Sequence, residues 1–454
     1  MSELWRLTPE FLVLGGALVA LFMSLVTSDR NAPARGGATF ALAAAIAAGV
    51  IGPGGALFDG MLEFGTASVF ARIAIPALAA VWLLWVAGRG TGPERSAEAA
   101  ALALFSVLGG MLMVSARDLI VLYISLELST MPAYVLIGYR RGDARGLEGA
   151  LKYFLLSMLT SLVLLYGFSF AYGLAGSTDY ADLAFGDGRL GQLAFAFVLV
   201  GMFAKLSAAP FHYWTPDAYA GASPQSVAFV STVPKVAGTV ALVQLIGAFA
   251  PGVEDATLIV VAAGLASMLL GNLAAYPQTD LRRLMAYSGV AHTGYILLAA
   301  ATGTTGSAAA VFYSVAYAVP SMAIMLLAAE EGTSLDDIGG LATRRPALAG
   351  AAAVWLLSLV GIPPMVGFFG KLYLFTSAVQ AGLLWPVLVA VAMSVVSAGY
   401  YLKVLRAVFF GRREDAPVVG RSIVAMLALG VSTLVVLGLG IFASPVLEFL
   451  GVAF

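Results

Sequence analysis

Long apolar stretches separated by short polar segments run along the whole chain. An apolar stretch of about 20 residues is long enough to cross a bilayer as a helix. Stretches of this kind cover approximately residues 9–28, 37–53, 66–88, 97–115, 118–138, 147–173, 190–220, 224–250, 256–276, 283–302, 305–331, 346–380, 384–410 and 422–445. The pattern therefore predicts an all-α integral membrane protein with about fourteen transmembrane helices.

The seventh and twelfth predicted helices are too long for one crossing and contain helix-breaking residues. The seventh contains Pro210 and Pro216, and the twelfth contains Pro363 and Pro364 among several glycines. Proline removes a backbone donor and interrupts a helix, so both are predicted to be discontinuous. Each is the fourth helix in a group of five, helices 4–8 and 9–13. Five helices cross the membrane an odd number of times, so a second copy starts on the opposite side and is inverted relative to the first. Inverted repeats with broken helices are typical of transporters.

This grouping predicts four segments. They are three N-terminal helices in 1–96, a first repeat in 97–250, a second, inverted repeat in 256–410 and a last helix in 411–454.

Composition narrows the possible functions. Only 11% of the residues are charged and 61% are hydrophobic, whereas soluble domains carry about 25% charged residues. The absence of cysteine excludes disulfides, thiolate zinc sites and iron–sulfur clusters held by this chain. The net charge of −1 argues against a nucleic-acid surface. No phosphate-binding or dinucleotide-binding motif is present, so we expect no cofactor and no metal in this chain.

Arginine predicts the orientation of the helices. Fourteen arginines fall in loops that follow odd-numbered helices, namely Arg30, Arg35, Arg89, Arg95, Arg140, Arg141, Arg145, Arg282, Arg283, Arg344, Arg345, Arg412, Arg413 and Arg421. Four are assigned to the other side, namely Arg6, Arg72, Arg117 and Arg189. Because cytoplasmic loops carry the excess of basic residues, the odd loops are predicted to be cytoplasmic and both termini periplasmic. The adjacent arginine pairs are best explained as topology signals.

Lysine has the opposite distribution. All five lysines fall inside apolar spans: Lys152, Lys205, Lys235, Lys371 and Lys403. A lysine at the bilayer centre costs roughly 2.5–3.5 kcal/mol on insertion scales, so five such residues suggest function. Lys152 and Lys403 lie near helix ends and can also be explained by snorkelling to the interface. Lys235 lies deep and directly after a proline, and Lys205 and Lys371 lie at the two predicted breaks.

Glu127 is the acidic residue near the centre of a span. A carboxylate there needs a basic partner, and Lys205 and Lys152 are the candidates. Moving a carboxylate toward or away from a buried lysine changes whether the lysine holds its proton. A row of such groups joined by water would form a proton relay, although a purely structural ion pair is the alternative. Sodium transport is less favoured, because a hard cation prefers several oxygen ligands.

The chain has two histidines, His212 and His292. Each can act as a water-bridging relay residue or as a hydrogen-bonded structural residue. Two histidines can also ligate one haem, which would define a haem-carrying quinone oxidoreductase subunit. That alternative is disfavoured because it leaves the buried lysines unexplained.

Several motifs resemble those of the antiporter-like membrane subunits of respiratory complex I, specifically the subunit N type. The stretches are LYISLELSTMPAYVLIGY (122–139), LKYFLLSMLTS (151–161), KLSAAPFHYWTPDAYAGASPQSVAFVSTVPKVAG (205–238), TDLRRLMAYSGVAHTGY (279–295) and GIPPMVGFFGKLYLF (361–375). The resemblance covers roughly residues 100–410. Lysine rather than glutamate in the GFFGK context favours subunit N over subunit M.

The resemblance implies a role for each matching position. Glu127 and Lys205 correspond to the glutamate–lysine pair of the fifth and seventh helices. Lys235 corresponds to the central lysine of the eighth helix, and Lys371 to the basic residue of the twelfth. His292 corresponds to a relay position between them. Three further residues are possible relay or exit groups, namely Lys152, Lys403 and His212.

The resemblance also implies an enzyme context. The chain would be a non-redox, proton-translocating subunit of an NADH–quinone oxidoreductase in a bacterial inner membrane. NADH, FMN, iron–sulfur clusters and quinone would be bound by other subunits, and subunits M and K would be its neighbours in the lipid bilayer. The alternatives are a subunit of a multi-subunit cation/proton antiporter and an inert structural spacer.

Overall fold

The computed structural model describes residues 3–89, 96–140, 142–183, 188–253, 255–413 and 422–451. Arg95, Arg141 and Arg421, which contribute to the predicted charge asymmetry, lie outside these ranges.

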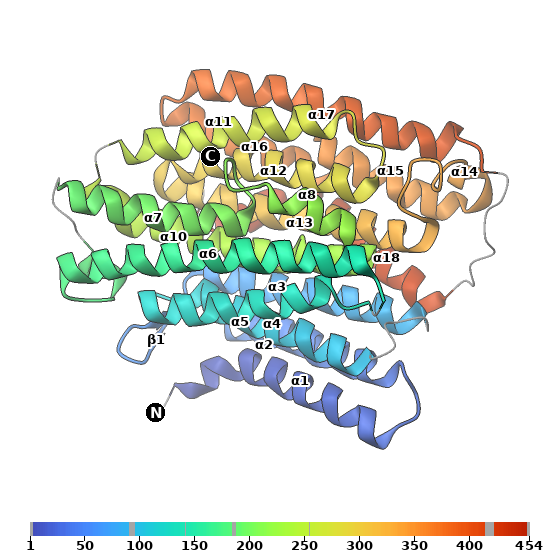
Figure 1. The fold of residues 1–454 in the computed structure, drawn as a ribbon, viewed down its shortest axis with the longest axis horizontal. Coiled ribbons are helices and arrows are strands. Elements are labelled where there is room, and N and C mark those ends of the chain that lie inside the picture. The colour runs from blue at the N-terminus through green and yellow to red at the C-terminus, as the bar shows by residue number, and fades with distance from the viewer. Residues whose placement is uncertain are drawn as a thin grey trace.

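Long helices lie side by side in one bundle (Figure 1). The elements up to the middle of the chain are η1 (Leu4–Leu7), α1 (Thr8–Val26), α2 (Ala32–Ile51), β1 (Ala56–Leu57), β2 (Leu62–Glu63), α3 (Thr66–Arg89), α4 (Ser96–Ser115), α5 (Leu119–Ile137), α6 (Ala144–Ala175), η2 (Tyr180–Asp182), α7 (Arg189–Leu206), α8 (Trp214–Gly221), α9 (Pro224–Val230) and α10 (Val233–Phe249). The remaining elements are η3 (Ala250–Gly252), α11 (Ala256–Ala275), α12 (Leu281–Ala300), α13 (Gly303–Glu331), α14 (Leu341–Arg344), α15 (Pro346–Val360), α16 (Val366–Gln380), α17 (Leu384–Phe410), α18 (Ile423–Ile441) and α19 (Ala443–Phe449). The prediction of an all-α membrane protein is confirmed, with one short antiparallel hairpin, β1–β2, beside it.

Twelve helices among the described residues are long and apolar enough to cross a membrane. The other two predicted spans correspond to α12, which has 20 residues, and to the pair α15 and α16, which have 15 residues each. Every predicted span therefore has a helical counterpart, but the count of fourteen stays a prediction for these two.

Both predicted breaks are present. Helix α7 ends at Leu206 and α8 begins at Trp214, while α15 ends at Val360 and α16 begins at Val366. The eighth span, which was predicted to be continuous, is also interrupted, between α9 and α10. Pro234 lies in the first turn of α10, where its missing N–H leaves no unpaired donor. The chain therefore starts a new helix at this point.

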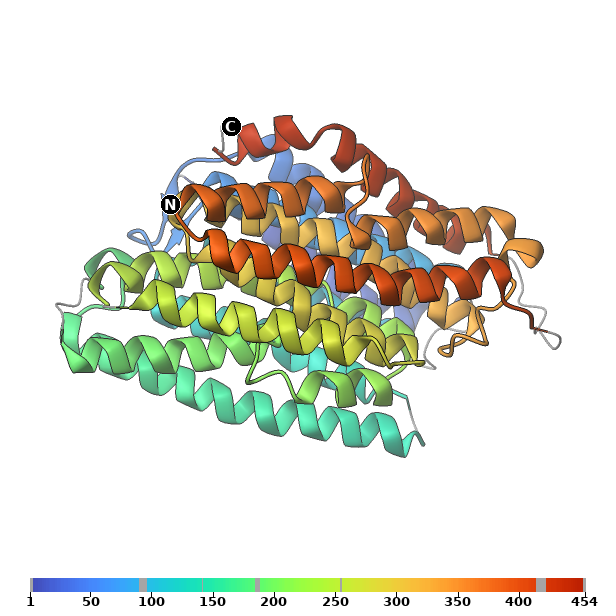
Figure 2. The same cartoon turned by 90° about the horizontal axis from the view of Figure 1, so that it is seen from above.

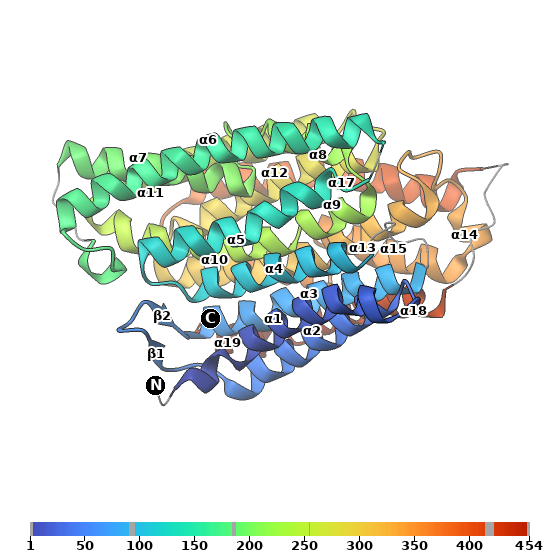
Figure 3. The same ribbon diagram turned by 60° about the horizontal axis from the view of Figure 1, so that its bottom comes forward.

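Helix α13 lies at the centre of the bundle. Its most apolar stretch is completely buried, and it packs against α9, α10, α12, α15, α16 and α18. Figures 2 and 3 show the surrounding helices from two further directions. The last long helix, α18, packs on α3 as well as α13, so the two ends of the chain are joined in one bundle.

Small residues let helix backbones approach closely within the two halves of the bundle. A Cβ added at Gly109 in α4 would lie 2.4 Å from the Ser129 backbone nitrogen in α5. A Cβ added at Gly271 in α11 would lie 2.4 Å from the Ala291 backbone nitrogen in α12. Small residues at contacts are the usual way in which helices pack in membranes.

The first and last described elements, η1 and α19, lie toward one end of the bundle, and α14 lies at the opposite end (Figures 1 and 2). This arrangement agrees with an even number of crossings. Arg72, which was assigned to the same side as Arg6, is not in a loop. It lies inside α3, fully buried, with its Nη2 2.7 Å from Glu10 Oε2. Hydropathy alone could not reveal this pair, since its partner is 62 residues away.

Candidate functional site

A buried ion pair joins α5 to α7. Lys205 Nζ lies 3.4 Å from Glu127 Oε1, and their side chains are only 5% and 11% exposed. Ser161 in α6 donates to the same carboxylate oxygen at 2.6 Å. Lys205 also donates to Tyr134 Oη at 3.0 Å and to Ser157 Oγ at 2.8 Å. Of the two lysines considered as partners for Glu127, the structure selects Lys205.

The break in the seventh span explains the position of Lys205. It lies in the last turn of α7, where the unpaired carbonyls of a helix favour a cation. Ser207 follows in the left-handed region, with φ of 64°, and takes the chain out of the helix. The break therefore places the lysine charge at the negative end of a half-helix.

Lys235 has a different environment. It lies in the first turn of α10, where the helix dipole does not favour a cation. Its Nζ is buried and has no hydrogen-bond partner in the described part of the chain. A Cβ added at Gly289 would lie 3.1 Å from this nitrogen. Gly289 thus provides the space that the ammonium group occupies.

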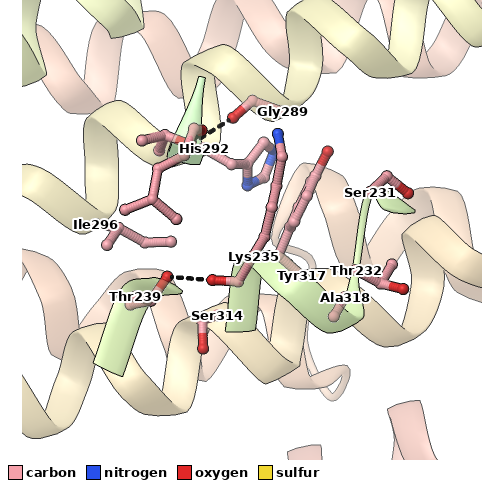
Figure 4. Close-up of a pocket in the computed structure, with 12 residues that line it drawn as sticks. Ser231, Thr232, Lys235, Thr239, Gly289, His292, Ile296, Ser314, Tyr317 and Ala318 are labelled. Carbon is pink, nitrogen blue, oxygen red and sulfur yellow. Dashed lines mark hydrogen bonds between the residues drawn. The ribbon is translucent and has the colours of Figure 1, made fainter. Parts of the chain in front are cut away.

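A small cavity of about 10 Å³ lies beside Lys235, comparable with the space that one buried water needs. Its polar lining comes from α10, α12 and α13 and from the junction before α10. Figure 4 shows the Lys235 side chain with the imidazole of His292 and the ring of Tyr317 beside it. Leu206, adjacent to Lys205, also lines the cavity. The cavity therefore lies between the end of α7 and helices α10, α12 and α13.

His292 is 2% exposed and is held by tyrosines. Its Nδ1 lies 2.7 Å from Tyr313 Oη, and its Nε2 lies 3.1 Å from Tyr401 Oη. The ring of Tyr317 stacks on the imidazole at 4.2 Å between centroids. Ser288 continues the chain of hydroxyls through Tyr401. These groups can each donate or accept a hydrogen bond, which is the property that a proton wire requires.

Lys371 is held by the second broken helix. Its Nζ donates to the carbonyls of Leu359 and Val360 at 3.1 and 2.9 Å, and to Ser394 Oγ at 2.8 Å. The two carbonyls belong to the last turn of α15, where they have no intrahelical partner. Lys371 thus provides a hydrogen-bond donor for backbone carbonyls that the break leaves without a helical partner. Its Nζ also lies 5.6 Å from the ring centroid of Tyr295.

The three less certain residues lie outside this group. Lys152 is exposed and pairs with Glu148 and Asp217, at 2.8 and 3.0 Å. Lys403 is partly buried and donates to the carbonyl of Gln278 at 3.1 Å. His212 is partly buried in the segment between α7 and α8. For Lys152 and Lys403, the interfacial explanation fits these positions better than a place in the buried row.

Sequence reasoning missed the hydroxyl groups and a second buried network. Tyrosines and serines are common in helices, and only their convergence on a lysine or histidine in the folded structure distinguishes these ones.

The second network lies at the end of α13. There Glu330 and Glu331 are buried and lie 2.6 and 2.9 Å from Arg345. Arg344 lies 2.9 Å from Glu331. The Glu-Glu and Arg-Arg pairs at the adjoining span ends were a usable signal for this network.

No group of three His, Asp or Glu side chains in the described ranges is arranged to hold a metal ion.

The fold and the buried charges define a polytopic membrane protein of transporter type. Residues 116–397 match the family described as NADH:quinone oxidoreductase/Mrp antiporter, TM. NADH-quinone oxidoreductase subunit N of Rhizorhabdus wittichii is 38% identical over 465 residues, covering 97% of this chain and 95% of that protein. Subunit N of Erythrobacter litoralis is also 38% identical, over 437 residues, covering 91% of this chain and 90% of that protein.

Comparison with solved structures shows the same fold in related membrane complexes. A chain of respiratory complex I from Thermus thermophilus with bound aureothin has a TM-score of 0.86 and 31% identity, covering 97% of this chain and 99% of that one. A chain of the Mrp complex from Dietzia sp. has a TM-score of 0.87 and 24% identity, covering 99% and 96%, and shares the fold. The protein belongs to the NADH:quinone oxidoreductase/Mrp antiporter family, among the subunit N members of NADH-quinone oxidoreductase. The resemblance drawn from the sequence motifs is confirmed.

Proposed function

We propose that this chain is a proton-translocating membrane subunit of a bacterial complex I-type NADH–quinone oxidoreductase. The observation that carries the proposal is the series of buried basic groups at helix breaks, each in a different environment. Lys205 pairs with a carboxylate, Lys235 Nζ has no hydrogen-bond partner among the residues that the structure describes, and Lys371 binds backbone carbonyls. Such a series can hold and release protons one site at a time.

The relay would run from the Glu127–Lys205 pair through Lys235 and His292 to Lys371. Lys205 or Lys235 would receive a proton from the cytoplasm. His292, with its tyrosine partners on both ring nitrogens, would pass it toward Lys371, from which it would leave outward. The Glu127–Lys205 pair would be the gate, because separating the two charges changes the field at the lysine.

The chain would not carry out the redox chemistry. NADH oxidation with FMN and iron–sulfur clusters, and quinone reduction, would take place in other subunits, and this chain would bind no cofactor. We place it in the inner membrane with the arginine-rich end of the bundle in the cytoplasm and both termini in the periplasm. An antiporter-like subunit M and a small subunit K would be its neighbours.

The two broken helices support a division into inverted repeats. We propose that 97–250 and 256–410 are the two copies, flanked by 1–96 and 411–454. In each copy the fourth span breaks, and a buried lysine, Lys205 or Lys371, lies at the break.

Co-purification tests this function. A tagged chain extracted from native membranes should be recovered with NADH oxidation activity, and the isolated complex in vesicles should acidify the lumen when given NADH and quinone. A cation/proton antiporter subunit would instead be recovered without NADH oxidation and would exchange sodium for protons. An inert spacer would tolerate Lys371→Met with no loss of pumping.

A further inference from the structure

Helix α8 lies between the two lysine centres of the first half of the bundle. This eight-residue helix is the second part of the broken seventh span. It packs against α6, which contributes to the Glu127–Lys205 centre, and against α12, which lines the Lys235 cavity. Two of its aromatic residues, Trp214 and Tyr219, are 3% and 1% exposed.

Trp214 holds the end of α7 next to Lys205. Its Nε1 donates to the carbonyl of Ala204 at 2.9 Å. Thr215, the next residue, donates to Ser207 Oγ at 2.7 Å. These bonds join the start of α8 to the last turn of α7 across the break. A shift of the Lys205 backbone would therefore also move the Ala204 carbonyl to which Trp214 is hydrogen-bonded.

A row of aromatic rings extends from Trp214 to the Lys205 side chain. Trp214 stacks on Tyr153, with centroids 4.0 Å apart and planes at 9°. Tyr153 packs edge-on against Tyr134 at 4.6 Å. Tyr134 accepts the Lys205 hydrogen bond, and Lys205 Nζ lies 5.7 Å from its ring centroid.

On its other side, Trp214 packs edge-on against Tyr219, with centroids 6.4 Å apart. Lys235 Nζ lies 5.8 Å from the Tyr219 ring centroid. The Tyr219 hydroxyl has no hydrogen-bond partner among the described residues, so its ring is not fixed by a polar bond. Cation–π attraction requires a charged lysine, so the attraction between this ring and Lys235 depends on the charge of Lys235.

We propose that Trp214 and Tyr219 are positioning residues that couple the charge of Lys205 to that of Lys235 through the row Tyr134–Tyr153–Trp214–Tyr219. Buried side chains are close-packed, so displacement of one ring is passed to the next. When Lys205 moves relative to Glu127, the row changes the distance between the Tyr219 face and Lys235. The inference rests on the proposed proton relay.

The test compares protons translocated per NADH oxidised in vesicles containing the assembled complex. Tyr219→Leu removes the aromatic face, whereas Tyr219→Phe retains it. Trp214→Leu removes both the ring stack and the bond to Ala204. Trp355 provides a matched control, because it is also a buried indole, on α15, and donates to Thr433 Oγ1 at 3.1 Å. Trp355→Leu therefore removes a comparable ring outside the row.

We expect Tyr219→Leu and Trp214→Leu to lower the ratio of protons to NADH while NADH oxidation by the assembled complex continues. Tyr219→Phe and Trp355→Leu should keep the wild-type ratio. The inference is overturned if Tyr219→Leu pumps as well as Tyr219→Phe. It is also overturned if Trp214→Leu loses only assembly, as a structural residue would. Lys235→Met separates the two proposals: a normal ratio in that variant rejects the relay itself, whereas a low ratio beside a normal Tyr219→Leu rejects the coupling alone.

Discussion

Replacing Glu127 with glutamine tests the gate of the proposed relay. The amide keeps the shape of the side chain and can still accept the Ser161 hydrogen bond, but it removes the negative charge opposite Lys205. With the two atoms 3.4 Å apart, the Coulomb attraction at an effective dielectric of about 20 is about 5 kcal/mol. Desolvation offsets part of this attraction, and removing one partner of a buried pair costs roughly 3–5 kcal/mol.

An energy of that size changes the balance between paired and separated states by roughly two to four powers of ten. Glu127→Gln should therefore leave the relay unable to cycle. The assay is lumen acidification per NADH oxidised by inside-out vesicles, with the amount of assembled complex measured in parallel. We expect a marked fall in protons per NADH.

Ser161→Ala is the matched control, because it removes the hydrogen bond that a neutral hydroxyl donates to the same carboxylate oxygen and leaves both charges in place. Losing a hydrogen bond to a charged group costs about 1.5–3 kcal/mol, less than losing the charge itself, so pumping should remain much closer to wild type than in Glu127→Gln. Equal pumping by Glu127→Gln and Ser161→Ala, at normal assembly, would refute the argument that the charge pair is the gate.

Three further predictions follow from single contacts. Lys371→Met removes the ammonium that satisfies the end of α15, and we expect lower protons per NADH with assembly retained; unchanged pumping would exclude it from the relay. Arg345→Ala removes the cation that pairs with the buried Glu330 and should destabilise the complex by roughly 3–5 kcal/mol. The measurement is the Tm of the complex, which should fall while the pumping ratio of the surviving complex stays unchanged. Gly367→Ala places a Cβ 1.8 Å from the Ser358 carbonyl oxygen, so the α15–α16 junction must move and the assembled amount should fall; normal assembly would contradict this packing.

Much of the fold follows from hydropathy and proline positions. The apolar runs predicted the helices, and the prolines at 210 and 363–364 predicted the two breaks, because these are local properties of the chain. The interruption between α9 and α10 was missed, since a single proline fits either a kink or a new helix start. The burial of Arg72 inside a helix was missed because its partner Glu10 lies in another helix.

The candidate site was predictable only in part. The lysines were found because a cation inside an apolar span is costly. Which of them face the interior depends on helix rotation and packing, so the sequence left both the exposed Lys152 and the buried Lys205 as candidate partners of Glu127. The tyrosines around His292 were missed for the same reason, because Tyr313, on α13, and Tyr401, on α17, lie far apart in the chain.

The most direct test of the account is proton pumping by Lys235→Arg. Arginine keeps the positive charge and much of the length of Lys235, but it is effectively never deprotonated in proteins. If Lys235 takes up and releases a proton in each cycle, Lys235→Arg complexes should oxidise NADH while translocating fewer protons per NADH than wild type. A wild-type ratio in fully assembled Lys235→Arg complexes would contradict the account.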